Sequence, residues 1–203
     1  FSFVYFIYNY LIISISYLFY KIFILFNKKS FDRENKWRDL LYSVPEKNKL
    51  RILIHSASMG EFEQAKPVIE EIRKIYNDCE IIASFFSPSG YDNQKNYQYI
   101  NNALYLPIDT ESNAKEFVDI LKPDIAIFVR YDLWLNTLLA LNKANCKNFL
   151  ICAAKPSENW FSSKKLAKSY FMHSYNQFQH IFTVDAIQTK YLQSINVTSP
   201  ITT

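Results

Sequence analysis

The stretch Ser58-Met59-Gly60-Glu61 brings a hydroxyl, a glycine and a carboxyl to the predicted start of a helix. Serine followed three positions later by glutamate is a capping box, in which each side chain satisfies a backbone amide of the first helical turn. A glutamate in this position can also face a ligand crevice and accept a proton from a hydroxyl nucleophile. The residue types alone leave the capping role and the general-base role of Glu61 open, with Ser58 and Gly60 as its neighbours in the crevice.

Two later stretches carry polar side chains that could contact a ligand. Ser87, Ser89 and Gly90 offer hydroxyls and backbone amides at another helix start, where an ordinary N-cap and turn is the simpler interpretation. Arg130 and Asp132 follow a later apolar run, and a local ion pair is the alternative to a binding role there. We predict all five as ligand-binding positions.

Basic side chains recur near the fifth apolar run. Lys155 directly follows that run, and Trp160, Lys164 and Lys168 are spaced by four residues along the helix predicted after it. A solvated basic face is the simpler interpretation of this spacing, and a stripe facing phosphates or a membrane is the sharper one. We include Lys155 among the predicted binding residues.

Several classes of site are not supported by the sequence. Neither Gly-x-x-x-x-Gly-Lys nor Gly-x-Gly-x-x-Gly occurs, which argues against a P-loop and a dinucleotide fingerprint. The three histidines are scattered and the three cysteines lack ligand spacing, so we predict neither a metal nor a cofactor. The net charge of +4 is mild and contains no long basic run, so we predict no nucleic-acid partner.

Short apolar runs alternate with helical periods from Leu50 onward, which predicts an α/β fold. Strands are predicted at 50–57, 80–86, 103–107, 124–129, 148–154 and 180–184. Helices are predicted at 61–76, 90–98, 111–121, 132–144, 157–176 and 185–194. Such alternation indicates a Rossmann-like sheet of parallel strands, joined by right-handed crossovers and covered by helices on both faces.

Open parallel sheets bind ligands beyond the carboxyl ends of their strands. The polar residues singled out above all follow predicted strands, so they should gather at one edge of the sheet. Gly60 and Gly90, the two glycines of the chain, also fall at this edge. We expect each to supply a positive φ or a close approach of backbone.

The first 26 residues form an apolar segment in which residues 1–20 carry no charge. A helix over this span would be about 39 Å long, enough to cross a bilayer of roughly 30 Å, although a buried core helix is the alternative. Basic residues follow at once, and the positive-inside rule then keeps the later chain on the cytoplasmic side. We predict a membrane anchor over 1–26, a basic connector over 27–49 and a Rossmann-like lobe over 50–203.

The motifs of this lobe resemble those of the 3-deoxy-D-manno-octulosonic acid (Kdo) transferases of lipopolysaccharide synthesis, over most of the chain. Ser-Met-Gly-Glu ahead of an Ala-x-Pro helix is the most specific of them. The matching stretches are HSASMGEFEQAKPVI (55–69), SFFSPSGY (84–91), YLPID (105–109), PDIAIFVRYDLWLN (123–136) and CAAKPSENWF (152–161).

The resemblance implies the N-terminal, acceptor-binding lobe of an inverting GT-B glycosyltransferase. It implies a lipid A precursor as acceptor, and CMP-Kdo as donor on a C-terminal lobe that the chain lacks. Glu61 falls on the proposed general base of the family, and Asp132 on an acidic residue that is usually glutamate. Arg130 and Lys155 depart from the usual glutamate and arginine. The chain begins at Phe1 rather than Met and stops abruptly at Thr203, so we predict a fragment cut at both ends. The resemblance implies an inner-membrane enzyme of which such a fragment is inactive alone.

Two other functions remain open at this point. One is a membrane-anchored, non-catalytic binding module built on a Rossmann-like lobe. The other is a different GT-B glycosyltransferase of the cell envelope.

Overall fold

The computed structural model describes residues 2–130, 132–155 and 165–203. Its centre is a parallel sheet with the strand order β3-β2-β1-β4-β5-β6-β7. The strands are β1 Arg51–Ser56, β2 Glu80–Phe85, β3 Asn102–Tyr105, β4 Ile125–Val129, β5 Lys147–Ala153, β6 His180–Thr183 and β7 Ile201–Thr202. From β1 the chain first builds the sheet outward on one side, through β2 and β3, and then returns to place β4 on the other side of β1. The carboxyl ends of β1 and β4 are therefore the switch point of a doubly wound sheet.

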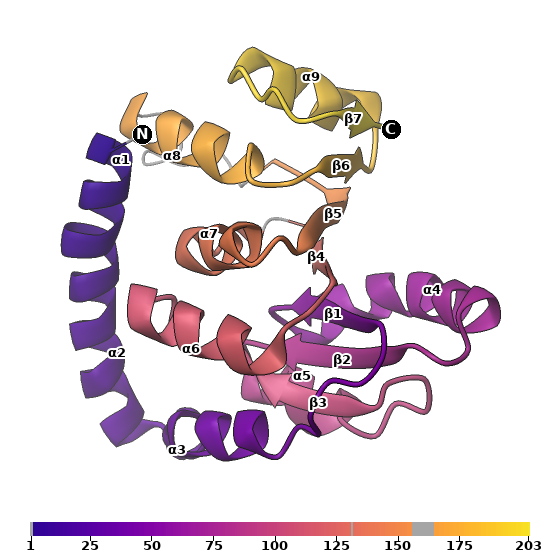
Figure 1. Ribbon diagram of the computed structural model, residues 1–203. Coiled ribbons are helices and arrows are strands. Elements are labelled where there is room, and N and C mark those ends of the chain that lie inside the picture. Colours follow the sequence, from indigo (N-terminus) through magenta and orange to yellow (C-terminus); the bar gives the residue numbers. More distant parts are fainter. Residues whose placement is uncertain (1, 131, 156–164) are drawn as a thin grey trace.

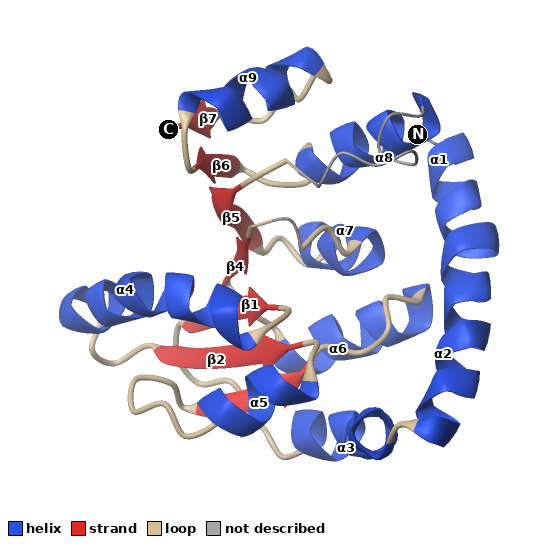
Figure 2. Cartoon of the chain, turned by 180° about the vertical axis from the view of Figure 1, so that it is seen from behind, coloured by secondary structure: helices blue, strands red, loops and turns tan. Residues whose placement is uncertain are grey.

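Helices cover both faces of the sheet, as Figures 1 and 2 show from opposite sides. The helices of the lobe are α4 Met59–Ile75, α5 Pro88–Gln94, α6 Glu111–Leu121, α7 Leu135–Lys143, α8 Lys165–Tyr175 and α9 Ala186–Ser194. Side chains alternate between the faces of a strand, and β1 shows the result. Ile52 and Ile54 pack with Phe62 of α4, whereas Leu53 packs with Phe117 of α6. The α/β fold class predicted from the sequence is confirmed.

The six predicted strands are present within about two residues of their expected ends, and β7 was not predicted. The helix expected over 132–144 begins only at Leu135, and the Asp132 carboxylate ahead of it accepts a hydrogen bond from the Ala57 amide in the turn after β1. Of the helix expected over 157–176, α8 accounts for Lys165–Tyr175. Trp160 and Lys164 lie outside the described residues.

The N-terminal apolar segment is one long helix built from α1 Ser2–Ile7, the π-helical turn η1 Tyr8–Ile13 and α2 Ser14–Phe26. We call this continuous element the N-terminal helix. Judged by length and composition alone, its stretch Phe3–Phe26 could cross a membrane. The helix runs alongside the ends of α6, α7 and α8 rather than projecting away from them (Figure 1).

The segment between this helix and β1 is largely helical, as α3 Lys28–Tyr42. Asn27 caps it by accepting a hydrogen bond from the Ser30 amide. Trp37 and Leu41 are buried in the same core as Phe117 of α6, so α3 is packed against the lobe. The division into anchor, connector and lobe stays a prediction.

Candidate functional site

The carboxyl ends of β1 and β4 bring two acidic side chains together. The Asp132 carboxylate accepts a 2.8 Å hydrogen bond from the Ala57 amide, which ties the loop after β4 to the turn after β1. Glu61 lies in that same turn, in the first turn of α4, and both carboxyls are more than nine-tenths buried. Burial raises the pKa of Asp132 well above its usual range, and the negative charge of Glu61 adds to the shift. Asp132 therefore holds a proton more readily than an ordinary aspartate, which suits it to share one with a ligand.

The capping interpretation of Glu61 is confirmed by the structure. Its carboxylate accepts a 3.0 Å hydrogen bond from the Ser58 amide, and Ser58 is the N-cap of α4. A role as general base is compatible with this contact, because a carboxylate has about four lone-pair sites and the amide uses one. The proton-transfer role of Glu61 stays a prediction.

His55 lies beneath the carboxyl pair and is fully buried at the end of β1. Trp134 donates its indole N–H to Nε2 of His55 at 3.0 Å, and Nδ1 lies 2.9 Å from Oγ of Ser84. Since an indole N–H can only donate, Nε2 is the acceptor and Nδ1 carries the hydrogen. Burial lowers the pKa of His55 to about 3, helped by the charge of Arg33. The uncharged His55 therefore holds Trp134 through a hydrogen bond. It forms no ion pair with Asp132, whose carboxylate lies 3.6 Å from its Nε2.

We expect acid to destabilise the fold through His55. Its pKa in the folded state is about 3, below the ordinary 6.5, so the unfolded chain binds the proton more tightly. The stability that neutral His55 contributes is fully present above pH 6.5 and is lost as the pH falls toward 3. At about pH 4 the free energy of unfolding should be lower by about 3 kcal/mol. Denaturant unfolding against pH measures this loss. His55→Gln should flatten the profile; equal slopes in the parent protein and the variant would contradict the assignment.

A series of side-chain contacts connects Trp134 with the N-terminal segments. Trp134 stacks on Phe86 with ring centroids 4.7 Å apart, and the Arg33 guanidinium lies 4.2 Å from the centre of the Phe86 ring. Arg33 also donates to the hydroxyl of Tyr20 at 2.7 Å. The sequence analysis missed this series, because the partners come from four separate segments and no spacing connects them.

The turn after β2 lies directly beside the turn after β1. Ser87 is the N-cap of α5, where its hydroxyl accepts from the Gly90 amide at 3.0 Å, and its own amide donates to the Ala57 carbonyl at 2.8 Å. Oγ of the exposed Ser89 lies 3.2 Å from Oγ of Ser87. The two predicted turns therefore form one surface together with Asp132, and a ligand-binding role for them stays a prediction.

The two glycines serve different ends. A positive φ was expected as one reason for them, and this was wrong, since neither glycine has one. A close approach is real at Gly90, where an added Cβ would lie 2.9 Å from Cδ1 of Phe85 and 3.3 Å from the Met59 amide nitrogen. At Gly60 a Cβ would meet nothing within 4 Å apart from its chain neighbours, so the close approach expected there was also wrong.

We expect opposite stability effects from alanine at the two glycines. Gly60→Ala should stabilise the protein by about 0.5–1 kcal/mol, because glycine costs backbone entropy within a helix. Gly90→Ala should destabilise it by about 1–3 kcal/mol, because the new methyl group overpacks the contact with Phe85. Thermal unfolding of the two variants measures both signs. A loss of stability in Gly60→Ala would show that the space around a Cβ at Gly60 is not open.

Arg130 and Lys155 lie at the same edge but with different neighbours. Arg130 has a φ of 67°, in the left-handed region, and its amide donates to the Ile151 carbonyl across an irregular stretch of β5. Its positive charge acts on the thiol of Cys152, which opposes the burial that raises the pKa of that thiol. The Lys155 backbone amide donates to the side chain of Gln188 of α9 at 2.7 Å. Their binding roles stay predictions.

An apolar cavity of about 500 Å³ opens next to Asp132, between the N-terminal helix and the strand ends. Its volume falls in the range typical of small-molecule sites. Apolar side chains of the helix and the lobe make up most of its lining, among them Ile12, Ile13, Phe86, Ile108, Leu133 and Trp134.

Buried polar contacts fix the N-terminal helix as the wall of this cavity. The carboxylate of Asp109 accepts hydrogen bonds from Tyr8 of the helix at 2.7 Å and from the Asn136 amide of α7 at 2.9 Å. It also accepts from the amide and hydroxyl of Thr137, at 2.8 and 2.6 Å. One carboxylate thus joins the helix to the start of α7.

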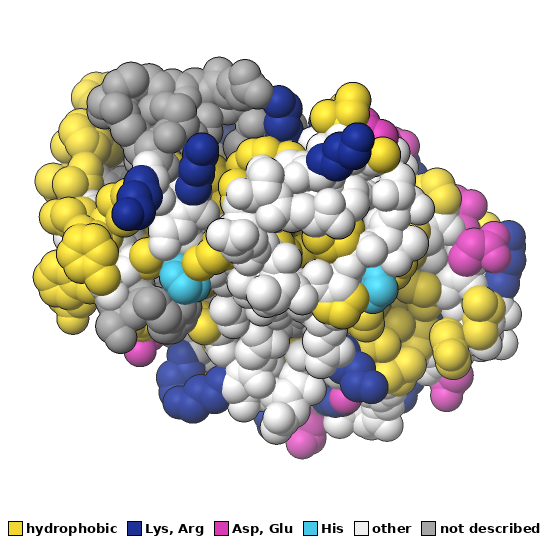
Figure 3. Space-filling model, turned by 90° about the horizontal axis from the view of Figure 1, so that it is seen from above, with side chains coloured by type: hydrophobic (Ala, Val, Ile, Leu, Met, Phe, Trp, Pro, Cys, Tyr) yellow, Lys and Arg dark blue, Asp and Glu magenta, His cyan; other side chains and the backbone are white. Residues whose placement is uncertain are grey.

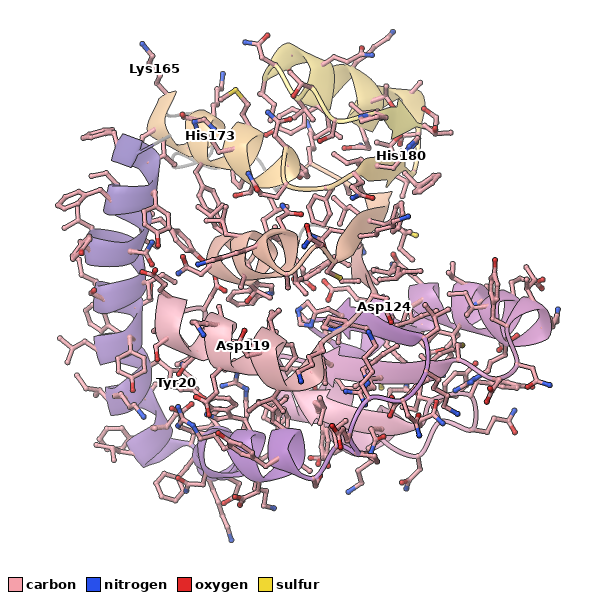
Figure 4. The ribbon with its side chains drawn as sticks, in the orientation of Figure 1. Tyr20, Asp119, Asp124, Lys165, His173 and His180 are labelled. Carbon is pink, nitrogen blue, oxygen red and sulfur yellow. The ribbon has the colours of Figure 1, made fainter. Side chains whose placement is uncertain are left out.

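A larger cavity, of about 700 Å³, lies at the opposite edge of the sheet. Asp119 and Asp124 are part of its lining, together with residues that precede β4 and β5 (Figure 4). Ligands of parallel sheets bind at the carboxyl ends of the strands, so we place the candidate site at the edge that carries Glu61 and Asp132. Within the described residues, no group of three His, Cys, Asp or Glu side chains could hold a metal ion.

The family profile of 3-deoxy-D-manno-octulosonic-acid transferase (kdotransferase) matches residues 30–203, which include both acidic residues and both turns. The chain belongs to this family. A 3-deoxy-D-manno-octulosonic acid transferase of Rickettsia bellii is 30% identical over 135 residues, which cover 66% of this chain and 32% of that protein. The transferase of Haemophilus influenzae is 26% identical over 140 residues, covering 68% of this chain and 33% of that protein. The chain therefore spans about a third of the length of these curated relatives.

The Kdo transferase lobe also resembles solved structures in its fold. The UDP-GlcNAc 2-epimerase of Neisseria meningitidis, solved with UDP-GlcNAc bound, aligns with a TM-score of 0.56 at 16% identity. The alignment covers 75% of this chain and 46% of that one. At this identity the likeness concerns the fold alone, and it agrees with the predicted lobe of a GT-B architecture.

Proposed function

We propose that the protein containing this chain is an inverting glycosyltransferase that transfers Kdo from CMP-Kdo to a sugar hydroxyl of a lipid A precursor. The observation that carries this proposal is the family match, because it includes the Glu61 turn. In the proposed reaction Glu61 removes the proton from the attacking hydroxyl, and the donor binds to a second lobe outside this chain. The chain supplies the acceptor half of the site.

The geometry at the strand ends supports an acceptor that is polar at one end and apolar at the other. Glu61 and Asp132 lie on the polar side, near the hydroxyls of Ser58 and Ser87. The apolar cavity begins at Asp132 and is walled by the N-terminal helix. A sugar held at the carboxyl pair would therefore leave its apolar substituent next to an apolar surface.

Each acidic side chain has a distinct part in the proposed reaction. An ionised Glu61 is a hydrogen-bond acceptor only, so it can take the proton of a hydroxyl nucleophile. Asp132, whose pKa is raised by burial, can hold a proton and donate it to an oxygen of the acceptor. Arg130 and Lys155, with the hydroxyls of Ser87 and Ser89, are proposed to contact the acceptor around this pair.

We further propose that the N-terminal helix holds the enzyme on the cytoplasmic face of the inner membrane. The helix is largely apolar, with Lys21 as its one charged side chain, and Lys28 and Lys29 follow it directly. Basic residues beside an apolar helix favour binding to the anionic lipids of the cytoplasmic leaflet, which supports the proposed location.

The test is a transfer assay with the intact protein, CMP-Kdo and a purified lipid A precursor. Product is identified by the mass of the added Kdo, and its anomeric configuration reports inversion or retention. Omission of either substrate is the control. Acceptor binding without turnover would instead support a binding module, and turnover only with another sugar nucleotide would support a different GT-B glycosyltransferase.

A further inference from the structure

Polar contacts hold one side of the N-terminal helix against the rest of the chain. We call this side its polar stripe. Tyr8 donates to Asp109 at 2.7 Å, and Asn9 accepts from the side-chain amide of Asn136 at 2.6 Å. Further along, Lys21 forms a 2.8 Å ion pair with Glu34 of α3. These contacts spread over thirteen positions, or about 20 Å of helix axis.

The π-helical turn extends this stripe. Its i→i+5 pattern shifts the facing residues by one position, so that Tyr8 and Ile13 are both buried against Leu135 of α7. Tyr8 also stacks on Tyr170 of α8, with ring centroids 5.2 Å apart. The helix is therefore part of the lobe's packing along its length.

The remaining surface of the helix is apolar and exposed. Leu18 is 62% exposed and Leu25 is 72% exposed. Other large apolar side chains on this surface share that exposure, among them Phe3, Phe6, Leu11, Ile15, Phe19, Ile22, Phe23 and Phe26. Figure 3 shows hydrophobic side chains gathered along the left edge of the molecule, the side on which α1 and α2 run in Figure 1. A contiguous apolar surface of this size marks an interaction site.

Basic side chains lie near both ends of this apolar surface. Lys28 and Lys29 are exposed directly after its carboxyl end. Near its amino end, Lys165 and Lys168 are exposed on α8, the helix whose Tyr170 stacks on Tyr8. Lys165 points away from the molecule there (Figure 4). Positive charge at both ends of one apolar face complements a bilayer with anionic headgroups.

A spanning orientation conflicts with these contacts. If the helix crossed the bilayer, Asp109 and Glu34, which are bonded to it about 20 Å apart, would be carried into or across the hydrocarbon core. Burying a charged side chain there costs about 2.5–3.5 kcal/mol each on insertion scales. Two exposed lysines of α8 would be drawn in with them.

We propose that the N-terminal helix lies in the plane of one leaflet of an anionic phospholipid bilayer and does not span it. Its exposed apolar face enters the boundary between headgroups and acyl chains, while its polar stripe stays on the lobe. The basic residues at both ends then contact headgroups of the same leaflet. One consequence rests on the proposed function as well: the cavity beside Asp132 is held at the level of the headgroups.

The depth of three helix positions tests this orientation. Leu11, Leu18 and Leu25 are seven residues apart, lie on the exposed surface and span about 21 Å of helix axis. Each is replaced by cysteine in the intact protein carrying Cys152→Ala and is labelled with a fluorophore, while Cys79 and Cys146 stay buried. Quenching by brominated lipids then reports depth in phosphatidylcholine vesicles that contain phosphatidylglycerol. An in-plane helix gives the same shallow depth at all three positions, and Ile75→Cys on α4 gives no quenching.

A charge on the exposed face tests the contact itself. Leu18→Glu should weaken vesicle partitioning by about tenfold or more, because it replaces a leucine that the bilayer would bury with a charged side chain. Ile75→Glu, at a position that is 70% exposed on the far side of the lobe, should leave partitioning unchanged. Removing phosphatidylglycerol from the vesicles should weaken binding of the parent protein.

Three outcomes would overturn the proposal. Depths that differ by most of a leaflet between Leu11, Leu18 and Leu25 would show a spanning helix. Absence of vesicle binding by the folded protein would show that lipid does not cover this face. Dimerisation that Leu18→Glu abolishes, without vesicle binding, would assign the face to a second copy. Since no sugar substrate is present, a failed transfer assay leaves these results unaffected.

Discussion

Glu61→Gln in the intact protein is expected to lose about 10²–10⁴-fold in Kdo transfer while its thermal stability stays close to that of the parent. Glutamine keeps an oxygen that can accept the hydrogen bond from the Ser58 amide, so the cap of α4 survives. It cannot take the proton of an attacking hydroxyl. The loss should appear in kcat, with acceptor binding retained, because the substituted side chain is nearly the same size and shape.

Glu63→Gln is the matched control for this variant. Glu63 is exposed two positions further along α4, about 200° around the helix from Glu61, and it pairs with Lys66 at 2.6 Å. It should keep near-parental turnover and melting temperature. Near-parental turnover in Glu61→Gln would leave only the capping role for Glu61. A fall in melting temperature that accounts for the lost activity would lead to the same conclusion.

Asp109→Ala is expected to lower the free energy of unfolding by about 3–5 kcal/mol. Its carboxylate accepts four hydrogen bonds, and their buried donors on Tyr8, Asn136 and Thr137 would lose their partner. Burial raises the pKa of Asp109, which reflects the cost of holding its charge there, while these donors oppose the shift. The melting temperature should fall by about 6–20 °C for a chain of this size.

The same variant should loosen the N-terminal helix. Because Tyr8 loses its bond to the lobe, limited proteolysis is expected to cleave within the helix sooner than in the parent protein. Asp119→Ala, at an exposed position of α6, is the control and should change stability by less than about 0.5 kcal/mol. Unchanged melting and proteolysis in Asp109→Ala would show that this carboxylate does not hold the helix.

The sequence by itself determined the fold class and the edge of the sheet where the polar residues gather. Apolar runs of strand length, alternating with helical periods, leave a parallel doubly wound sheet as the way to bury both kinds of element. In such a sheet the residues that follow each strand share one edge, so the positions of Ser58, Glu61, Ser87 and Asp132 at that edge could be predicted. The capping box of Glu61 was also readable, because it depends on neighbours three residues apart.

Only the tertiary structure decided which of these groups interact. The bond from Ala57 to Asp132 joins residues 75 positions apart, and the contact of Trp134 with His55 joins residues 79 apart, so no local spacing encodes them. The pKa values of Asp132 and His55 depend on burial, which packing sets. The N-terminal segment shows the same division: its composition predicted a helix suited to a membrane, while the long-range bonds of Tyr8 and Asn9 decided that it lies along the lobe.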